Sequence, residues 1–342
     1  MPKARRVTIR DVATRAGVSV GTVSKALNGR GKLRPETRDR VAAVARELDF
    51  APNILARGLL DGHTYTVGVV TTGSFGRLST PVMLGASDAL GAERISVFMC
   101  AGRDLPGRER QQVEMLLSRR VDGFIVAGRR IEPRPSIGML RGIPVVYAMT
   151  QPLDSDEPAI LPDDLGGGLL AGEHLTGLGR RRLGHITGPE RFLAARKRAQ
   201  GFCQAVVAAE AELPANHVLY GEWSESWGRE AAQLLLRTAT GVDAIFCGSD
   251  KIARGVSDTL RRAGCRVPED IALVGFDNWG PLVLGADPPL TSVDMCLKNI
   301  GRMAAGYLLS AISGTPMSGV HIAPCRLAVR SSSVADSAPG QC

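Results

Sequence analysis

Apolar residues recur at helical spacing in three short stretches within the first fifty positions. In the stretch 9–16 they share one helical face, and Thr8 with the acid three positions later forms a capping box at its start. Gly17 then supplies the positive φ angle that ends a helix and permits a tight turn. Ser19 is suited to cap a second helix, over 20–27.

A third stretch begins at Pro35 and places Val41, Val44, Ala45 and Leu48 on one side of a helix. Three short helices around one small core, two of them joined by a tight turn, predict a helix-turn-helix whose second helix enters the major groove of DNA. The outer surface of that second helix is predicted to present Val20, Gly21, Thr22, Ser24 and Lys25. An ordinary helical hairpin is the alternative, but it leaves the agreement of caps, turn and charge unexplained.

From Thr66 the pattern changes to short β-branched runs that alternate with amphipathic stretches. This alternation predicts doubly wound parallel sheets, which bind ligands beyond the carboxyl ends of their strands. The cycle runs twice, over 66–163 and 164–291, so we expect two similar lobes around a cleft, with later segments crossing back. The expected strands are 67–70, 96–100, 124–127, 145–147, 185–187, 244–247 and 272–275. The expected helices are 82–91, 109–119, 166–178, 194–210, 228–239 and 251–263.

Charge separates the start of the chain from the rest. Residues 1–62 hold 13 Lys/Arg and 6 Asp/Glu, whereas the other residues hold 29 and 28, within a net charge of +8 for all 342 residues. A basic excess confined to one segment is what phosphate binding requires, because the release of counterions drives association. On charge alone, a solvated basic tail fits equally well.

The remaining chemistry of the chain is sparse. Seven scattered cysteines form no C-x-x-C pair, so we expect no metal site and a reducing compartment. The start of the chain lacks the apolar segment of a signal peptide, and no apolar run approaches the roughly 20 residues of a membrane span, so we expect a cytoplasmic protein. No H-E-x-x-H motif and no nucleophile elbow point to an enzyme, and no cofactor is expected.

The first helices carry a specific resemblance. The runs T-I-R-D-V-A-T-R-A-G-V-S-V-G-T-V-S-K-A-L-N and R-P-E-T-R-D-R-V-A-A-V-A-R-E-L-D-F-A-P-N resemble the lactose-repressor family of bacterial regulators, and the likeness continues along nearly the whole chain. The resemblance implies that Val20, Gly21 and Lys25 read bases. Lys25 is suited to donate to guanine and Val20 to touch a thymine methyl, while Gly21 has no side chain to read with. The implied phosphate anchors, which orient without specifying, are Thr8, Ser19, Thr22, Ser24, Asn28, Lys32 and Thr37.

Residues 51–62 form a short segment bounded by Pro and Gly, too short for an isolated helix. The resemblance implies a hinge helix that folds on DNA and pairs with its twin at Ala56. It also implies that Leu59 wedges into the minor groove, which kinks the duplex, and that Asn53 and Arg57 reach the groove or the backbone. A plain interdomain linker is the alternative.

The core resembles the fold of periplasmic sugar-binding proteins through motifs such as R-R-V-D-G-F-I-V (119–126), S-D-K-I-A-R-G (249–255) and L-V-G-F-D-N (273–278). Two departures are notable: Ser249 stands where the family often has asparagine, and Ala148-Met149 stand where many sugar-binding members have an acid. The residues at the family's effector-contact positions are Arg198, Asp277, Trp223 and Ser249. Phe75 and Arg77, in the loop after the first strand, are weaker candidates.

Together these features predict a sequence-specific DNA-binding transcriptional regulator, most simply a repressor of carbohydrate-utilisation genes. Its partners are expected to be double-stranded operator DNA, a small sugar-like effector in the interlobe cleft, and a second copy of the chain in a homodimer, with a tetramer as the alternative. The expected organisation is a headpiece (1–50), a hinge (51–62), an α/β core (63–330) and a disordered tail (331–342). A plain solute-binding protein and an enzyme with a DNA anchor are the competing classes.

Overall fold

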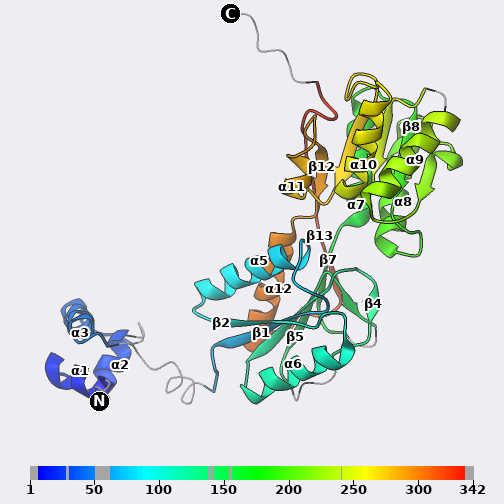
Figure 1. The fold of residues 1–342 in the computed structure, drawn as a ribbon. Helices are drawn as coiled ribbons and strands as arrows, with labels where there is room; N and C mark the ends of the chain where they lie inside the picture. The colour runs from blue at the N-terminus through cyan, green and yellow to red at the C-terminus, as the bar shows by residue number, and fades with distance from the viewer. Residues whose placement is uncertain are drawn as a thin grey trace, which may run out of the picture. The chain divides into compact units, whose positions relative to one another are not determined.

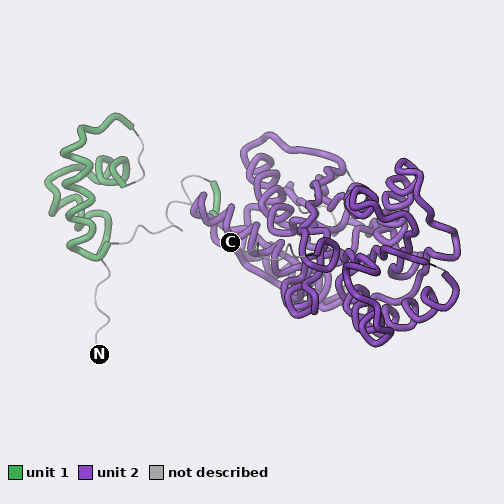
Figure 2. Tube along the Cα trace, turned by 90° about the horizontal axis from the view of Figure 1, so that it is seen from above, with its two compact units in different colours: residues 1–65 green, residues 66–342 purple. Residues whose placement is uncertain are grey.

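A computed structural model of the chain describes residues 7–27, 31–50, 62–137, 140, 142–153, 156–239 and 241–335. The chain divides into two compact units, Met1–Tyr65 and Thr66–Cys342 (Figure 2). Each unit has its own hydrophobic core.

The first unit contains the three expected helices: α1 (Ile9–Ala16), α2 (Val20–Leu27) and α3 (Pro35–Glu47). The predicted capping box at the start of α1 is present, and Gly17 ends the helix with a φ of 65°. The small core is made of fully buried Val12, Val23 and Val41 together with neighbouring alanines. The apolar positions that recur at helical spacing in the sequence are thus the positions that pack in the core of this unit.

In the described part of the second unit, the strands form two six-stranded sheets and one two-stranded sheet. In spatial order, the first contains β13 (Val320–Ala323), β7 (Ala159–Pro162), β5 (Val145–Ala148), β3 (Gly123–Ala127), β1 (Thr66–Thr71) and β2 (Ser96–Ala101) (Figure 1). The second contains β14 (Arg326–Ala328), β12 (Thr291–Asp294), β11 (Ala272–Phe276), β10 (Ala244–Cys247), β8 (Leu183–Thr187) and β9 (Val218–Tyr220). The small sheet pairs β4 (Pro133–Arg134) with β6 (Gln151–Pro152). The chain therefore passes between the large sheets after β7, after β12 and after β13.

Helices cover both faces of each large sheet. On the first, α5 (Ser79–Ala92) and α12 (Leu297–Ile312) lie on one face and α6 (Pro106–Ser118) on the other (Figure 1). On the second, α7 (Asp164–Gly177) and α8 (Leu193–Ala208) face α9 (Glu225–Thr238) and α10 (Asp250–Arg262) across the sheet. Short helices η1 (Ala215–His217) and α11 (Gly280–Val283) complete the second lobe. Two layers of helices around each sheet confirm the predicted doubly wound architecture.

Three helix pairs cross on reciprocal glycines. A Cβ at Gly85 of α5 would collide with the carbonyl oxygen of Lys298 in α12, and one at Gly301 would collide with that of Val82. The same arrangement joins α7 to α8 and α9 to α10, through Gly168 with Gly201 and Gly228 with Gly255. Without these side chains the backbones approach closely, which brings the start of α7 against α8.

Two expectations need correction. The ladder between β12 and β14 is antiparallel, so the second sheet is not wholly parallel. The expected disordered tail does not begin at residue 331: Ser332 and Ser333 are buried, and the Ser332 hydroxyl donates to the carbonyl oxygen of Leu273 at 2.6 Å. These residues bond to the first residues of β11 and β12, so the core extends at least to 335.

Among the helices of the described ranges, none has the length and apolar character needed to cross a membrane.

Candidate functional site

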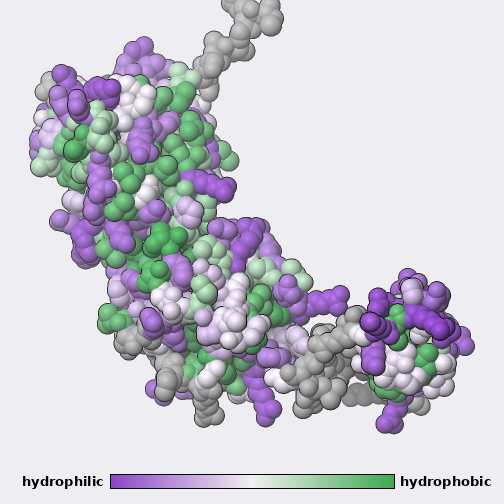
Figure 3. Space-filling view, turned by 180° about the vertical axis from the view of Figure 1, so that it is seen from behind, coloured by the Kyte–Doolittle hydropathy of each residue, from purple (hydrophilic) through white to green (hydrophobic). Residues whose placement is uncertain are grey.

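The outer surface of α2 carries the residues predicted to read bases. Val20 is 41% exposed, and Gly21 and Lys25 are also exposed, whereas Val23 and Ala26 on the opposite face are buried. The face of the first unit seen in Figure 3 is dominated by hydrophilic residues. An exposed helix face with one apolar and one basic reader is the surface that a major groove accepts.

The predicted phosphate anchors are distributed around this helix. Ser19 caps α2 by accepting the amide of Thr22 at 3.1 Å, and the two hydroxyls lie 2.9 Å apart. The hydroxyl of Thr8 donates to Asp11 at 2.7 Å, while Lys32 is exposed and Thr37 and Ser24 are half-buried. Five predicted DNA contacts lie outside the described residues: Asn28, Asn53, Ala56, Arg57 and Leu59.

The second unit holds a cavity of about 590 Å³, here called the cleft cavity. Residues from both lobes line it, and many follow the carboxyl ends of strands, where parallel sheets place their ligand sites. All six predicted effector contacts line it: Arg198, Asp277, Trp223, Ser249, Phe75 and Arg77. The structure thus brings together residues that are up to about two hundred positions apart in the chain.

Arg198 is fixed at the floor of the cleft cavity. Its Nε donates to Asp164 at 2.7 Å and its Nη1 to the carbonyl oxygen of Gly248 at 2.6 Å. The guanidinium carbon lies 3.6 Å from the centre of the Phe276 ring, a close cation–π contact. With a side chain only 7% exposed, Arg198 presents one orientation to a ligand.

Asp277 links the two lobes at the side of the cavity. Arg77, from the loop after β1, donates to its carboxylate at 2.5 Å, and Arg198 lies 3.8 Å away. Asp277 has a φ of 106°, a left-handed conformation that is rare for a residue with a side chain. Strained backbone of this kind clusters at functional sites, where the surrounding structure holds it in place.

Trp223, Phe75 and Ser249 contribute differently to the walls. Trp223 is half-buried and packs against Gly188, where an added Cβ would collide with its ring. Phe75 is 52% exposed at the mouth of the cavity. The Ser249 hydroxyl caps α10 by accepting the amide of Ile252 at 3.3 Å, so its acceptor capacity is partly used.

Sequence reasoning missed most of the other lining residues, among them two acidic ones, Asp164 and Glu132, together with Phe192, Arg130 and Lys251. Met149 confirms that no acid stands at this point in the wall. Glu132 crosses between the lobes, since its Oε1 accepts the amide of Leu193 at 2.7 Å. Asp164 was hidden because Asp163 beside it is the helix cap, accepting the amide of Gly166 at 2.8 Å. An acid next to a capping acid was the only signal available.

Two buried titratable groups, Asp250 and His185, interact with charges that line the cavity, those of Asp277 and Arg198 respectively. Burial, followed by the charge of Asp277, raises the pKa of Asp250 to about 7. Its oxygens accept the Trp279 amide at 2.7 Å and the Ser292 hydroxyl at 2.6 Å. Burial lowers the pKa of His185 to about 4, and the ring stacks on Phe246, so this histidine is neutral and structural.

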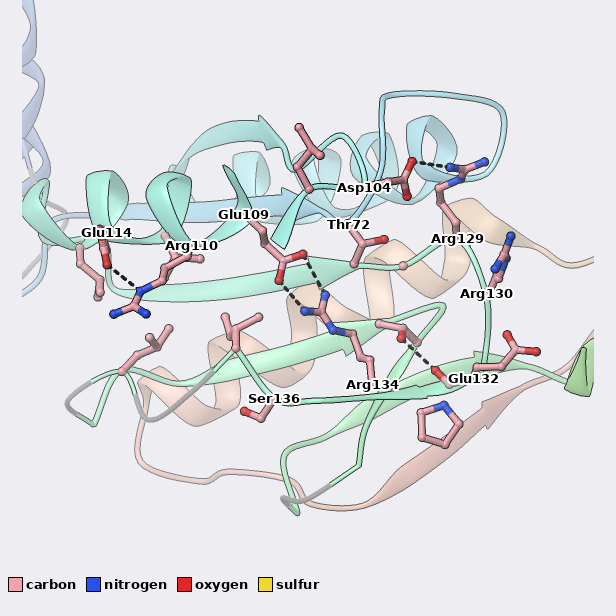
Figure 4. A pocket seen from close by; sticks show the side chains of 18 residues that line it. Thr72, Asp104, Glu109, Arg110, Glu114, Arg129, Arg130, Glu132, Arg134 and Ser136 are labelled. Carbon is pink, nitrogen blue, oxygen red and sulfur yellow. Dashed lines mark hydrogen bonds and ion pairs between the residues drawn. The ribbon is translucent and has the colours of Figure 1, made fainter. Parts of the chain in front are cut away.

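A second hollow of about 1080 Å³ lies against α6 in the first lobe (Figure 4). Its charges are largely paired. Arg134 donates to the Glu109 carboxylate at 2.5 and 3.0 Å, and Arg129 donates to Asp104 at 2.8 Å. Because these ion pairs already satisfy one another, the cleft cavity is the better candidate for a polar ligand.

Comparison with known proteins adds independent support. The family described as "Bacterial regulatory proteins, lacI family" matches residues 8–53, and a periplasmic binding protein-like domain matches residues 173–333. The transcriptional regulator CelR of Thermobifida fusca is 34% identical over 324 residues, 92% of this chain and 94% of its own. The transcriptional repressor CytR of Escherichia coli K12 is 30% identical over 329 residues, 95% of this chain and 96% of its own.

Solved structures agree with these relatives. A CelR–cellobiose complex has 31% identity and a TM-score of 0.65, covering 96% of this chain and 100% of its own. A lac repressor dimer bound to operator and an anti-inducer has 25% identity and a TM-score of 0.71, covering 97% of this chain and 100% of its own. With its helix-turn-helix unit and its two-lobed periplasmic-binding-protein-like core, the chain belongs to the lacI family of bacterial regulatory proteins.

Proposed function

We propose that the protein is a DNA-binding repressor of carbohydrate-utilisation genes, whose affinity for its operator is controlled by a small polar effector in the cleft cavity. The observation that carries the proposal is the presence, in one chain, of an exposed recognition helix and a cavity lined by all six predicted effector contacts. Its relatives are transcriptional regulators, not enzymes, and one was solved with cellobiose.

On DNA, Lys25 would donate to a guanine edge and Val20 would contact a thymine methyl. Hydroxyls and lysines around α2 would bind phosphates and fix the register of the helix. The segment 51–62 would act as the hinge, with Leu59 as the minor-groove wedge; this rests on the family resemblance.

We propose a homodimer as the DNA-binding form. One headpiece offers few base contacts, whereas two match a two-fold operator. Exposed apolar side chains support a self-association surface on the first lobe: Leu84 of α5 is 51% exposed, and Phe98 and Met99 of the edge strand β2 are 42% and 39% exposed.

The effector would act through differential affinity for two arrangements of the lobes, because a ligand that binds both equally shifts nothing. Contacts that cross the cleft, Arg77 with Asp277 and Glu132 with the amide of Leu193, are the ones that a lobe movement would break or strengthen.

Selection of bound sequences from random duplex DNA tests the proposal. We expect the wild-type protein to select a pseudo-palindromic site. Lys25→Ala should lose base preference at one position per half-site and weaken the binding free energy by about 1–3 kcal/mol. Arg110→Ala, which removes an exposed cation from α6, is the matched control and should leave the selected site unchanged. Failure to enrich any sequence would contradict the proposal.

A further inference from the structure

The cleft cavity has more cations than carboxylates. Five basic side chains line it, and three acidic ones. The basic residues are Arg77, Arg129, Arg130, Arg198 and Lys251, and the acidic ones are Glu132, Asp164 and Asp277. Which of these charges are already satisfied decides what the cavity attracts.

Each of the three carboxylates has a partner within the protein. Asp277 accepts from Arg77 at 2.5 Å, Asp164 from Arg198 at 2.7 Å, and Glu132 from the amide of Leu193 at 2.7 Å. Of the cations, Arg129 pairs with Asp104 outside the cavity at 2.8 Å. Within the described ranges, this leaves Arg130 and Lys251 without a carboxylate partner.

These two cations differ in their surroundings. Arg130 is exposed, and its guanidinium lies over the ring of Phe192 at 4.3 Å. Lys251 is half-buried in the wall of the cavity, at the second residue of α10. It is therefore the cation that a bound ligand would cover.

Lys251 is in an unfavourable place for stability alone. It sits in the first turn of a 13-residue helix, where the helix dipole favours negative charge. Its neighbour Asp250 offers no compensation, because both carboxylate oxygens are directed to Trp279 and Ser292. A cation that opposes the helix dipole and gains no ion pair within the protein is a candidate for a functional role.

At the floor of the cleft cavity, the unsatisfied group is an acceptor instead of a cation. Asp164 is 1% exposed and lines the same cavity, yet its Oδ2 has no hydrogen-bond partner among the described residues. A buried carboxylate oxygen left unpaired is costly, and a ligand hydroxyl would satisfy it. The cavity thus offers a ligand an unpaired hydrogen-bond acceptor at Asp164 and an unpaired positive charge at Lys251.

We propose that the effector is an anionic carbohydrate, a polyhydroxylated ring whose carboxylate or phosphate pairs with Lys251 and whose hydroxyl donates to Asp164. The proposal rests on the function proposed above and specifies its ligand class. Trp223 provides an apolar surface on which the ring can lie. Arg198, already held by Asp164 and Gly248, then orients the hydroxyls rather than neutralising the anion.

The test compares matched ligands on the full-length protein by calorimetry. The probes are glucose, galactose and mannose, each beside its uronate and its 6-phosphate, with inorganic phosphate as an additional probe. We expect at least one anionic sugar to bind roughly ten- to a hundredfold more tightly than its neutral parent, as expected for one charge-assisted contact. Uronates and 6-phosphates distinguish a carboxylate from a phosphate subsite.

Three variants locate the effect. Lys251→Gln should remove the preference for the anion while leaving binding of the neutral parent within about twofold, and Lys251→Arg should retain most of it. Lys197→Gln removes an equally half-buried cation that does not line the cavity, and should keep the preference.

A preference for neutral sugars, an anion preference that survives Lys251→Gln, or no binding by any probe would overturn the inference. Operator binding measured on the same preparations separates the two claims. A protein that binds its operator and responds to a neutral sugar keeps the proposed function and loses the anionic effector.

Discussion

Asp164 and Arg198 form the most buried ion pair of the cleft cavity, with side chains 0% and 7% exposed. Burial raises the pKa of Asp164, and the charge of Arg198 opposes this effect. Each partner therefore depends on the other, since an isolated charge at this depth is expensive.

Replacing Asp164 by Ala should lower the free energy of unfolding of the larger unit by about 3–5 kcal/mol, because it removes the hydrogen-bonded carboxylate from a buried guanidinium and leaves only Asp277, at 3.8 Å, as a counter-charge. Urea denaturation measures this. Asp163→Asn is the matched control, because asparagine caps a helix as well as aspartate, and it should change stability little. Equal losses in the two variants would show that the ion pair has no special role.

Asp250 should make stability depend on pH. Its pKa rises from 3.8 to about 7 on folding, so the folded state binds more protons than the unfolded state in this range, and stability contributed by the neutral form is lost as pH rises. His185 acts in the opposite direction: its pKa falls from 6.5 to about 4, so its contribution grows as pH rises.

Asp250→Asn separates these two effects, because asparagine can accept the Trp279 amide and donate to the Ser292 hydroxyl. The unfolding free energy of the variant minus that of the wild type should increase with pH between about 4 and 7, by up to about 1.4 kcal/mol per unit. It should level off above that range. A difference that does not vary with pH would mean that Asp250 is ionised throughout.

At the scale of elements, the headpiece depends on one turn. Gly17 adopts a φ of 65°, whereas Gly21 lies within α2 with space for a Cβ. Gly17→Ala should destabilise the headpiece by about 1 kcal/mol. Gly21→Ala should stabilise it by a similar amount, about 1 kcal/mol, because alanine is the better helix former.

Thermal denaturation followed by circular dichroism provides the comparison, and the opposite signs of these two matched changes are the signature of the turn. If both substitutions stabilise the unit, the left-handed conformation at Gly17 is not needed.

Much of this element structure was predictable. The strands β1, β2, β3, β5, β8, β10 and β11 coincide with the expected β-branched runs within two residues at each end. The strands that were not expected are β4, β6, β7, β9, β12, β13 and β14. They are two to four residues long; β7 ends in Pro162, and β13 and β14 have exposed positions. Their place comes from tertiary pairing, which no local pattern records.

The site was predictable to the same extent. Family positions identified Arg198 and Asp277, and both line the cleft cavity. Asp164 and Lys251 were not identified, because one looks like a second cap and the other like a surface lysine of an amphipathic helix. Only the close crossing of α7 and α8 at Gly168 and Gly201 reveals that Asp164 meets Arg198.

At the scale of the whole molecule, one chain contains a helix-turn-helix unit and a two-lobed core with a cleft cavity. The two units have separate cores. In the proposed homodimer, coupling between them would pass through a change in the arrangement of the lobes when the cleft cavity is filled. Such coupling is reciprocal: an effector that weakens operator binding must itself bind less well to the operator complex.

The most direct test is the operator affinity of the full-length protein, measured at one fixed salt concentration with and without a saturating carbohydrate that calorimetry has shown to bind. The account predicts a change of about 5- to 150-fold in affinity, which Arg198→Ala abolishes and Lys197→Gln preserves. An operator affinity that is the same with the cavity filled and empty would contradict it.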